Sequence, residues 1–390
     1  MDKKLAIILV NCLDYAERFL DDCIADLRKQ DYQGEIKIFF VNNGTSAESL
    51  QYAMKKMPEA EFIINNTNDG FAKGNNDGIK QALMQNFDYV ILFNLDMKFE
   101  PDCVRKMVEA IENNEMDYRF RPPERRVSGN DKKGEDNRKE SEDDKDDGSD
   151  KRKIGAVQAR LMLHPETDKI NSLGNVTHFL GFGYCSDYGR KFQETNSKRQ
   201  TIKNICYPSG AGVLFRADVL KKIGLFDEEM WMYNEDQDLG WRIWLAGFRC
   251  VLAPDAVAYH KYQFSRSITK YYWMDRNRII AMLKNYRFGT LLLILPAFIV
   301  MELGLILFAW KGGWLKEKIK VWQYFFSIKN WRYILRNRQE AQRLRKVKDC
   351  DIIPMFSGKI WYQEIDDIKL RLVNPVFNAY WWLVKKIVFW

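Results

Sequence analysis

The chain has 390 residues, 46% of them hydrophobic and 14% aromatic, with a formal net charge of +8. This length allows a large core and two or three structural units. Seven scattered cysteines, odd in number and without Cys-x-x-Cys spacing, argue against a disulfide framework or a structural zinc site and favour a reducing compartment.

The first hundred residues predict strands alternating with helices. Apolar, β-branched runs are typical of strands covered on both faces, and they occupy Leu5–Val10, Glu35–Val41, Glu61–Ile64 and Tyr89–Phe93. A helical pattern follows the first run, and another ends at Met84. This alternation predicts an α/β fold with a mostly parallel, doubly wound sheet. Ligands of such sheets bind at the carboxyl ends of the strands.

Polar residues gather where these predicted strands end. The polar strings are Asn11, 42–44, 65–78 and 94–96. We therefore expect a ligand site built from them. In the third string, glycines 70, 74 and 78 do not have the spacing of a dinucleotide fingerprint. The loop and helix start are instead predicted to lie over a nucleotide or diphosphate, using Asn68, Gly70, Gly74 and Asn75; the alternative is that the glycines serve only turn geometry.

The composition changes abruptly at 119–153, which is dense in charged residues and almost without apolar ones. Such a segment buries too little surface to offset chain entropy, so we expect a disordered insertion in a loop. Order resumes after it. The elements expected there are a strand within Pro208–Arg216, a helix to Ile223, strands at Arg249–Leu252 and Ala256–His260, and a helix at Tyr271–Tyr286.

Three carboxylates, Glu235, Asp236 and Asp238, lie within four residues after an aromatic run. An acidic helix start explains them adequately, because acidic residues are favoured in a first helical turn. A carboxylate beside aromatic walls can also act as a general base. Charge alone does not distinguish the three.

Together, several motifs resemble the family 2 of inverting nucleotide-sugar glycosyltransferases, and within it the rhamnosyltransferase-like members. The motifs are NDGFAKGNNDGI, the GAGVLFR–IGLFDE–YNEDQDLGWR run and YYWMDRNRI. The resemblance covers about Lys4 to Lys284 apart from the charged insertion. It implies a GT-A fold, with a Rossmann-like central sheet flanked by helices.

The resemblance also implies roles for particular residues. It assigns the strand ends, including Asn11, Asn42 and Asn43, to the nucleotide, and Asp236 to the catalytic base. Members usually carry an acid where Asn42 stands, so we expect an altered contact with the nucleobase.

Asn94-Leu95-Asp96 matches the metal–diphosphate motif of the family, with Mg²⁺ or Mn²⁺ as the expected cofactor. His260 is a second candidate ligand. The alternatives are an Asx-turn at Asp96 and a backbone-bonded histidine. Arg276 and Arg278 have the charge to clamp a diphosphate, or they belong to a solvated basic helix face.

Residues 290–310 form an apolar stretch long enough to cross a bilayer, with basic residues on both sides. A single crossing would place the Lys/Arg-rich tail outside, against the positive-inside tendency. We expect an in-plane helix or a hairpin bent at Pro296. The alternative is a soluble helical subdomain or an oligomer interface.

The predicted organisation is a GT-A domain at 1–286 and a basic, aromatic, membrane-associated helical region at 287–390. Leu5–Val10 is too short for a signal peptide, so we expect the cytoplasmic face of the membrane. Basic residues interleaved with tryptophan favour a membrane surface over nucleic acid, because no nucleic-acid-binding motif accompanies them.

The predicted function is metal-dependent, inverting sugar transfer from a dTDP-, UDP- or GDP-sugar to a hydroxyl of a lipid-linked or cell-surface glycan. Rhamnose is the first sugar to expect, from the resemblance alone. The alternatives are hexosyl transfer from a UDP- or GDP-sugar, and a catalytically silent nucleotide-binding scaffold of a membrane glycan-assembly complex.

Overall fold

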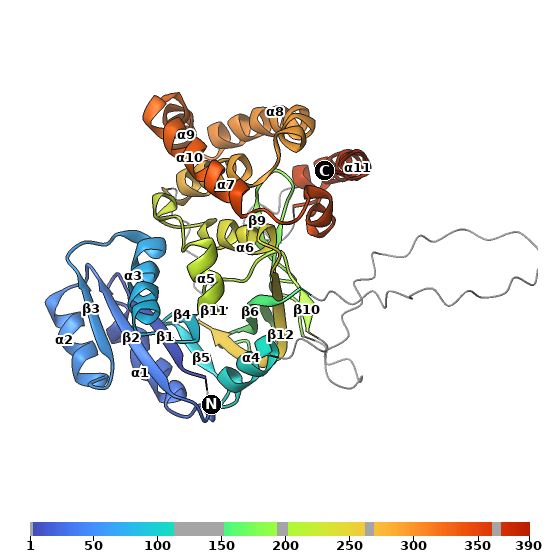
Figure 1. The fold of residues 1–390 in the computed structure, drawn as a ribbon. Helices are drawn as coiled ribbons and strands as arrows, with labels where there is room; N and C mark the ends of the chain where they lie inside the picture. The colour runs from blue at the N-terminus through green and yellow to red at the C-terminus, as the bar shows by residue number, and fades with distance from the viewer. Residues whose placement is uncertain (1–2, 113–151, 193–201, 262–268, 361–367) are drawn as a thin grey trace, which may run out of the picture.

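The computed structural model describes residues 3–112, 152–192, 202–261, 269–360 and 368–390. The predicted disordered insertion at 119–153 lies outside these ranges except for its last two residues. Within them, a ten-stranded sheet carries helices on both faces, and a group of helices gathers at one end of the molecule (Figure 1).

The first four strands form the parallel half of the sheet. They are β1 (Leu5–Asn11), β2 (Ile36–Asn43), β3 (Glu61–Asn65) and β4 (Tyr89–Phe93). They lie in the order β4-β1-β2-β3, so all four carboxyl ends share one edge. The four strand predictions are confirmed to within two residues at each end.

The second half of the sheet is mixed. Its long strands are β6 (Ile154–Leu163), β11 (Gly212–Arg216) and β12 (Arg249–His260). β11 is antiparallel to both β4 and β6, whereas β12 is parallel to β6. The predicted parallel order therefore holds for the first half of the sheet only.

β12 joins two stretches that the sequence predicts as separate strands. A register shift against β6 between Ala253 and Val257 accommodates the interruption without ending the strand. The short strands complete the sheet and a separate hairpin: β5 (Met97–Phe99), β7 (Ile170–Ser172), β10 (Lys203–Asn204), β8 (Asn175–Thr177) and β9 (Gly183–Cys185).

Both faces of the sheet are covered, as the unbroken apolar strands require. In β1, Leu5, Ile7 and Leu9 belong to one core cluster, while Ala6 and Ile8 belong to the other. The helices of the first cluster are α1 (Ala16–Leu27), α2 (Ala47–Lys56) and α4 (Cys103–Glu112); those of the second are α3 (Gly70–Met84), α5 (Ala217–Ile223) and α6 (Glu235–Leu245).

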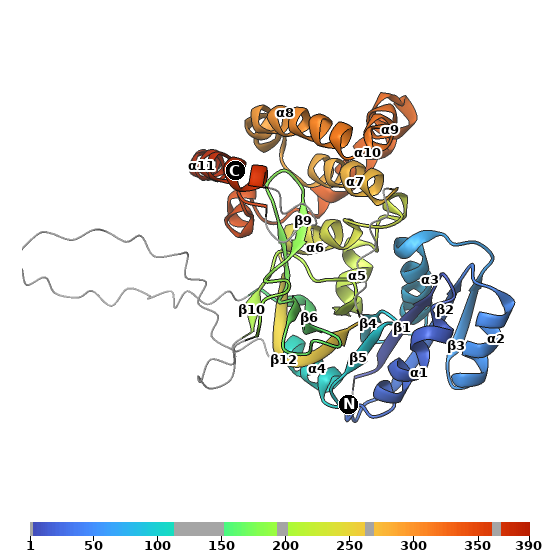
Figure 2. The ribbon, with the colours of Figure 1, turned by 180° about the vertical axis from the view of Figure 1, so that it is seen from behind.

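The remaining helices stand beyond α6, away from the parallel half of the sheet (Figures 1 and 2). They are α7 (Thr269–Asn285), α8 (Phe288–Lys311), α9 (Leu315–Phe326), α10 (Ile328–Leu344) and α11 (Ile368–Ile387), with short 3-10 turns at Asp349–Asp351 and Ile353–Met355; a further 3-10 turn, Glu228–Met230, precedes α6. Ile294, Val321 and Trp381 of this group join the core cluster that includes α3 and α6.

α8 is one continuous helix that passes through Pro296. The alternative of a hairpin bent at that residue is therefore wrong. The helix is long and apolar enough to cross a membrane, and only 17% of its most apolar 18 residues are buried inside the protein. The predicted division at residue 286 falls between α7 and α8 and stays a prediction.

Candidate functional site

Asparagines from three strand ends meet at the shared edge of the parallel half sheet. Asn11 and Asn42 are paired across β1 and β2, and both are buried. Asn11 donates from Nδ2 to Ser49 Oγ at 3.1 Å and accepts the backbone N–H of Ala16 at 3.0 Å. Asn42 accepts from the hydroxyl of Thr45. The fold thus brings these two side chains together, as predicted. Their polar atoms already form hydrogen bonds with other residues of the protein.

Asn43 connects β2 to the start of α3. Its Nδ2 donates to Asn68 Oδ1 at 3.2 Å and to the carbonyl of Gly70 at 3.1 Å, and its Oδ1 accepts from Asn65 Nδ2 at 3.3 Å. Asn68 also accepts the N–H of Gly70 at 3.1 Å and remains exposed. Of the predicted nucleotide residues in this cluster, Asn68 therefore has the most open side chain.

Two different structural constraints explain why glycine occupies positions 70, 74 and 78 of α3. Gly70 has a φ of +86°, and a Cβ there would lie 2.5 Å from the indole of Trp231. A Cβ on Gly74 would lie 3.0 Å from Val10, and one on Gly78 would lie 2.5 Å from Ile8, because α3 packs closely on β1. The alternative that these glycines serve only turn geometry is therefore incomplete.

Asn75 is buried within α3 and donates from Nδ2 to the carbonyl of Phe71 at 2.9 Å. Direct contact of Gly74 and Asn75 with a nucleotide stays a prediction.

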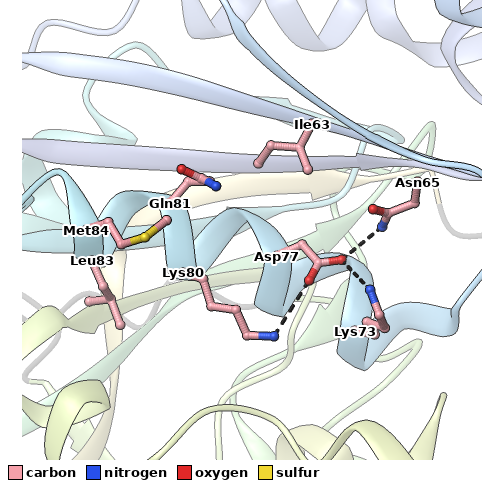
Figure 3. A pocket seen from close by; sticks show the side chains of 8 residues that line it. All are labelled: Ile63, Asn65, Lys73, Asp77, Lys80, Gln81, Leu83 and Met84. Atoms are coloured by element: carbon pink, nitrogen blue, oxygen red, sulfur yellow. Dashed lines mark hydrogen bonds and ion pairs between the residues drawn. The ribbon is translucent and has the colours of Figure 1, made fainter.

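A groove of about 620 Å³ lies beside this cluster, between α3 and β3 (Figure 3). Asp77 at its centre accepts from Asn65 at 2.9 Å and from Lys73 at 2.8 Å, and it lies 3.6 Å from Lys80. The groove reaches the asparagine cluster through Asn65, but neither Asp96 nor Asp236 lines it. Its charged groups pair with one another.

Asp96 and His260 are brought together by the pairing of β5 with β12, in which Met97 faces His260. The Nε2 of His260 lies 3.2 Å from Oδ1 of Asp96, and its Nδ1 lies 3.2 Å from Oδ1 of Asn171. The His260 side chain is 8% exposed and that of Asp96 is 17% exposed. The histidine is therefore bonded to side chains on both nitrogens.

Asn171 was not predicted, and no spacing in the sequence marks it. Its contact with Nδ1 orients the ring so that Nε2 faces Asp96. The described residues contain no group of three or more His, Cys, Asp or Glu side chains that could hold a metal. Among the described residues, a cation here would have Asp96 and His260 as protein ligands, and the bound donor or water would supply the others.

Asp236 lies in the first turn of α6, partly exposed, and accepts the N–H of Gln237 at 2.8 Å. Burial raises the pKa of Asp236 to about 6, although backbone N–H groups of Gln237 and Gly210 act in the opposite direction. A carboxylate with this pKa is a stronger base than an ordinary aspartate and is still mostly ionised at neutral pH.

The structure separates the three carboxylates that charge alone did not distinguish. Glu235 is buried, and its Oε2 has no hydrogen-bond partner among the described residues; burial, and next the charge of Asp236, raise its pKa well above the usual value. Asp238 is fully buried between Arg242 at 2.9 Å and Lys284 at 3.0 Å. Although burial opposes ionisation, these cations lower the pKa of Asp238 to about 2. Asp238 therefore fixes α6 against α7.

The loop that leads into α6 is strained. Trp231, Tyr233 and Asn234 have φ values of 58°, 69° and 65°, which side-chain-bearing residues seldom adopt. Asn277 of α7 donates from Nδ2 to the carbonyls of Met230 and Tyr233, both at 2.8 Å, and also to that of Met232. Asn277 holds the loop in this shape and was missed by sequence reasoning, although it stands inside the YYWMDRNRI motif.

Arg276, the predicted diphosphate clamp, is 3% exposed. Its guanidinium donates to the carbonyl of Glu229 and to Asn277, and it lies 4.5 Å from the ring centre of Trp273. Arg278 is 1% exposed, so the alternative of a solvated basic helix face is wrong for both arginines. Contact of Arg276 with a diphosphate stays a prediction.

The two predicted chemical centres approach the same part of the sheet. The N–H of Asn94, two residues before Asp96, donates to the carbonyl of Ala211 at 3.2 Å. The next residue back, Gly210, presents its N–H to the carboxylate of Asp236. A Cβ on Gly210 would lie 2.7 Å from Phe71, so the start of α3 reaches the same place. The end of β4, the start of β11 and the first turns of α3 and α6 thus converge.

Comparison with known proteins gives a family match. Residues 5–224 match the profile described as glycosyl transferase family 2. Two curated relatives are poly-beta-1,6-N-acetyl-D-glucosamine synthases of Staphylococcus epidermidis, one of them from strain RP62A. Each is 22% identical over 253 residues, which are 64% of this chain and 48% of the relative. The chain therefore spans about half the length of the curated relatives it matches.

Two solved structures show a weaker likeness. TarS of S. aureus, residues 1–349 in complex with UDP, gives a TM-score of 0.47 at 15% identity, covering 98% of this chain and 90% of that one. GalNAc-T7 with UDP, GalNAc and Mn²⁺ gives a TM-score of 0.47 at 11% identity, covering 72% and 48% of the two chains. The assignment of the family rests on the sequence profile.

Proposed function

The chain belongs to glycosyltransferase family 2, and from that premise we propose that it transfers a sugar from a nucleotide-sugar donor to a hydroxyl of a glycan acceptor. The GT-A fold that this family implies is confirmed, with a parallel Rossmann-like half, a mixed half and helices on both faces. The observation that carries the proposal is that Asn94, at the strand end leading to Asp96, bonds the carbonyl of Ala211, and that the adjacent Gly210 presents its N–H to Asp236.

Asp236 is the proposed general base. It would take the proton of the acceptor hydroxyl as that oxygen attacks the anomeric carbon. One base and one direct displacement invert the anomeric centre, whereas retention by double displacement needs an additional nucleophile. Burial and the charge of Asp236 raise the pKa of Glu235, which favours its neutral form and leaves Asp236 as the ionised carboxylate in this proposal.

Asp96 and His260 are the proposed protein ligands of Mg²⁺ or Mn²⁺. A carboxylate oxygen and an imidazole nitrogen 3.2 Å apart fit such an ion, and Asn171 orients the imidazole. When bound, the ion would neutralise charge on the leaving diphosphate. Asp96 and His260 hold their places through the β5–β12 pairing.

The asparagine cluster of Asn11, Asn42, Asn43 and Asn68 is the proposed nucleotide side of the site. Asn42 has a neutral amide where family members usually carry an acid, so in this proposal a neutral side chain contacts the nucleobase of the donor. Rhamnose from dTDP-rhamnose remains the first proposal. A hexose-type sugar is the second, favoured by the N-acetylglucosamine named in the curated relatives.

A screen of donors tests this function. The purified chain is warmed with dTDP-rhamnose, UDP-N-acetylglucosamine or GDP-mannose, with and without Mn²⁺, and release of nucleoside diphosphate is measured alongside. A donor at 100 times its Kd should stabilise the fold by about 2.7 kcal/mol. We expect one donor to stabilise the protein and to be slowly hydrolysed with metal. Stabilisation without hydrolysis would instead identify a nucleotide-binding scaffold.

We further propose that the enzyme works at the cytoplasmic face of a membrane, on a lipid-linked or cell-surface glycan. The length and apolar composition of α8 support this proposal.

A further inference from the structure

The C-terminal helices leave many large apolar side chains in solvent. On α8, the exposed ones are 45–68% accessible: Phe288, Leu292, Leu295, Ile299, Val300, Leu303, Leu307 and Trp310. α9, α10 and the α11 end add Ile319, Phe326, Ile328, Trp331, Leu335, Val373, Val376, Trp382, Leu383, Ile387 and Phe389. We call these residues the apolar platform. Along α8 the exposed apolar residues recur mostly every three or four positions and so lie on one face of the helix, and an exposed apolar face of this length marks an interaction site.

Basic residues border the platform. Lys320 follows Ile319 on α9, and on α10 Lys329, Arg332 and Arg336 each follow an exposed apolar residue. Consecutive residues of a helix point about 100° apart, so on α9 and α10 basic side chains lie beside the exposed apolar ones. Among the described residues 287–348, Glu340 is the one acidic residue classed as exposed.

This pattern fits the surface of an anionic lipid bilayer. Apolar stripes enter the boundary of the acyl chains while lysine and arginine meet phosphate groups at the headgroup level. Trp310, Trp331 and Trp382 are 65%, 37% and 52% exposed, and tryptophan is enriched at that level of a membrane. A second copy of this chain would bring the same basic stripes against each other, which is unfavourable.

α8 is held to the protein at both ends and in the middle. At its start, the N–H of Arg287 and the hydroxyl of Thr290 donate to Asp349 Oδ2 at 2.9 and 2.6 Å. Just after its end, Trp314 stacks on Tyr271 with 4.8 Å between ring centres.

Glu302, near the middle of α8, faces the protein and not the platform. It accepts from Lys318 of α9 at 2.6 Å and from the guanidinium of Arg278 of α7. Lys318 is fully buried, and Arg278 is 1% exposed. A helix that crossed a bilayer would have to break these buried ion pairs, which is costly because it leaves uncompensated charges.

We propose that the apolar platform rests on an anionic bilayer, with α8 in the membrane plane and both of its ends on the same side. α8 forms the outer layer of this end of the molecule, with α7 beneath it in both views (Figures 1 and 2). The inference deepens the proposed membrane association and does not depend on the donor or on the chemistry at Asp236.

The test compares two charge-matched double variants of the full chain. Leu303→Glu/Leu307→Glu places two carboxylates on the platform, and Met54→Glu/Met84→Glu places two on exposed positions of α2 and α3. Flotation with vesicles of phosphatidylcholine and phosphatidylglycerol measures binding. Each leucine removed from the acyl boundary should weaken binding by about tenfold or more, whereas the control binds as the unchanged protein does. Vesicles of phosphatidylcholine alone, which carry no net charge, should bind the unchanged protein more weakly than the anionic vesicles do.

Equal vesicle binding by the two double variants would overturn the proposal. So would light scattering that shows a dimer converted to a monomer by the platform variant while vesicle binding stays unchanged, because the platform would then belong to a second copy. Trypsin added outside sealed vesicles checks the orientation: we expect cleavage within 311–348 without detergent, and a 311–348 fragment that is cut only after detergent is added would mean that α8 crosses the bilayer.

Donor hydrolysis is measured on the same samples. Absence of hydrolysis from the unchanged protein and from both variants would contradict the proposed function and leave the platform proposal untouched. Loss of vesicle binding with normal hydrolysis is the result expected of the platform variant.

Discussion

The imidazole of His260 lies 3.2 Å from the carboxylate of Asp96, at the junction where β5 pairs with the end of β12. If the pair holds a divalent cation, His260→Ala should raise the Mn²⁺ concentration for half-maximal donor hydrolysis. Asn171→Ala, which removes the side chain that orients the ring, should raise it by about 10–100-fold. Metal titrations measure both shifts. His164→Ala serves as the control, and equal metal dependence in all variants would remove the assignment.

The raised pKa of Asp236 predicts an acidic limb in the pH profile. When Asp236 is protonated it cannot take the proton of the acceptor hydroxyl, so kcat/KM should fall about tenfold per pH unit below about pH 6. Initial rates between pH 4.5 and 8.5 measure the limb. A profile flat through pH 5 would show that another group acts as the base.

Glu235→Gln tests the other half of this pair. Because the pKa of Glu235 is raised, the folded protein binds its proton more tightly than the unfolded chain does, and Glu235 makes stability fall as pH rises above its unfolded value. Glu235→Gln should flatten that fall in urea unfolding experiments and leave the acidic limb of activity in place. A limb that moves to lower pH in Glu235→Gln would mean that Glu235 is ionised beside Asp236.

Asp238→Asn should destabilise the fold. The substitution leaves Arg242 and Lys284 buried without their shared carboxylate, at a cost of about 3–5 kcal/mol. The pKa of Asp238 is lowered, so its stabilising contribution is present above the unfolded pKa and is lost as pH falls toward about 2. Urea unfolding measures the loss, and adding Lys284→Met should recover part of it. A stable Asp238→Asn protein would contradict the role in fixing α6.

Asn277→Ala should separate activity from stability. Without its three hydrogen bonds the strained loop relaxes and α6 shifts, and a displacement of about 1 Å can lower kcat by about 10²-fold. Asn374→Ala is the matched control, since Asn374 is also a buried asparagine and bonds the backbone of Ile360, not the loop before α6. Both variants should lose some stability. A structural role alone would leave kcat of the folded fraction equal in the two.

The sequence predicted those parts of the fold that local patterns determine. The parallel strands were recognisable because residues such as Ile7 and Ile91 belong to unbroken apolar runs. The sequence predicts two strands in place of β12 because the stretch near Pro254 is typical of a strand end. In the structure, pairing with β6 continues on both sides of this stretch, so the strand is not interrupted.

The site could be predicted only in part. The strand-end asparagines and Asp96 follow from the order of strands, because parallel strands end at one edge. Asn171 and Asn277 act through contacts with residues far away in the chain, and no local pattern marks such contacts. Asp238 differs from Asp236 in bonding Arg242, one turn along the same helix, and Lys284, which folding brings from α7.

Activity of Asp236→Asn, measured together with donor binding, tests the central claim most directly. The substitution removes a base that contributes about 10²–10⁴-fold in rate but no expected contact with the donor. We expect transfer and donor hydrolysis to fall by that factor while the donor that stabilises the unchanged protein stabilises the variant equally. Undiminished transfer by Asp236→Asn, at full donor binding, would contradict the account.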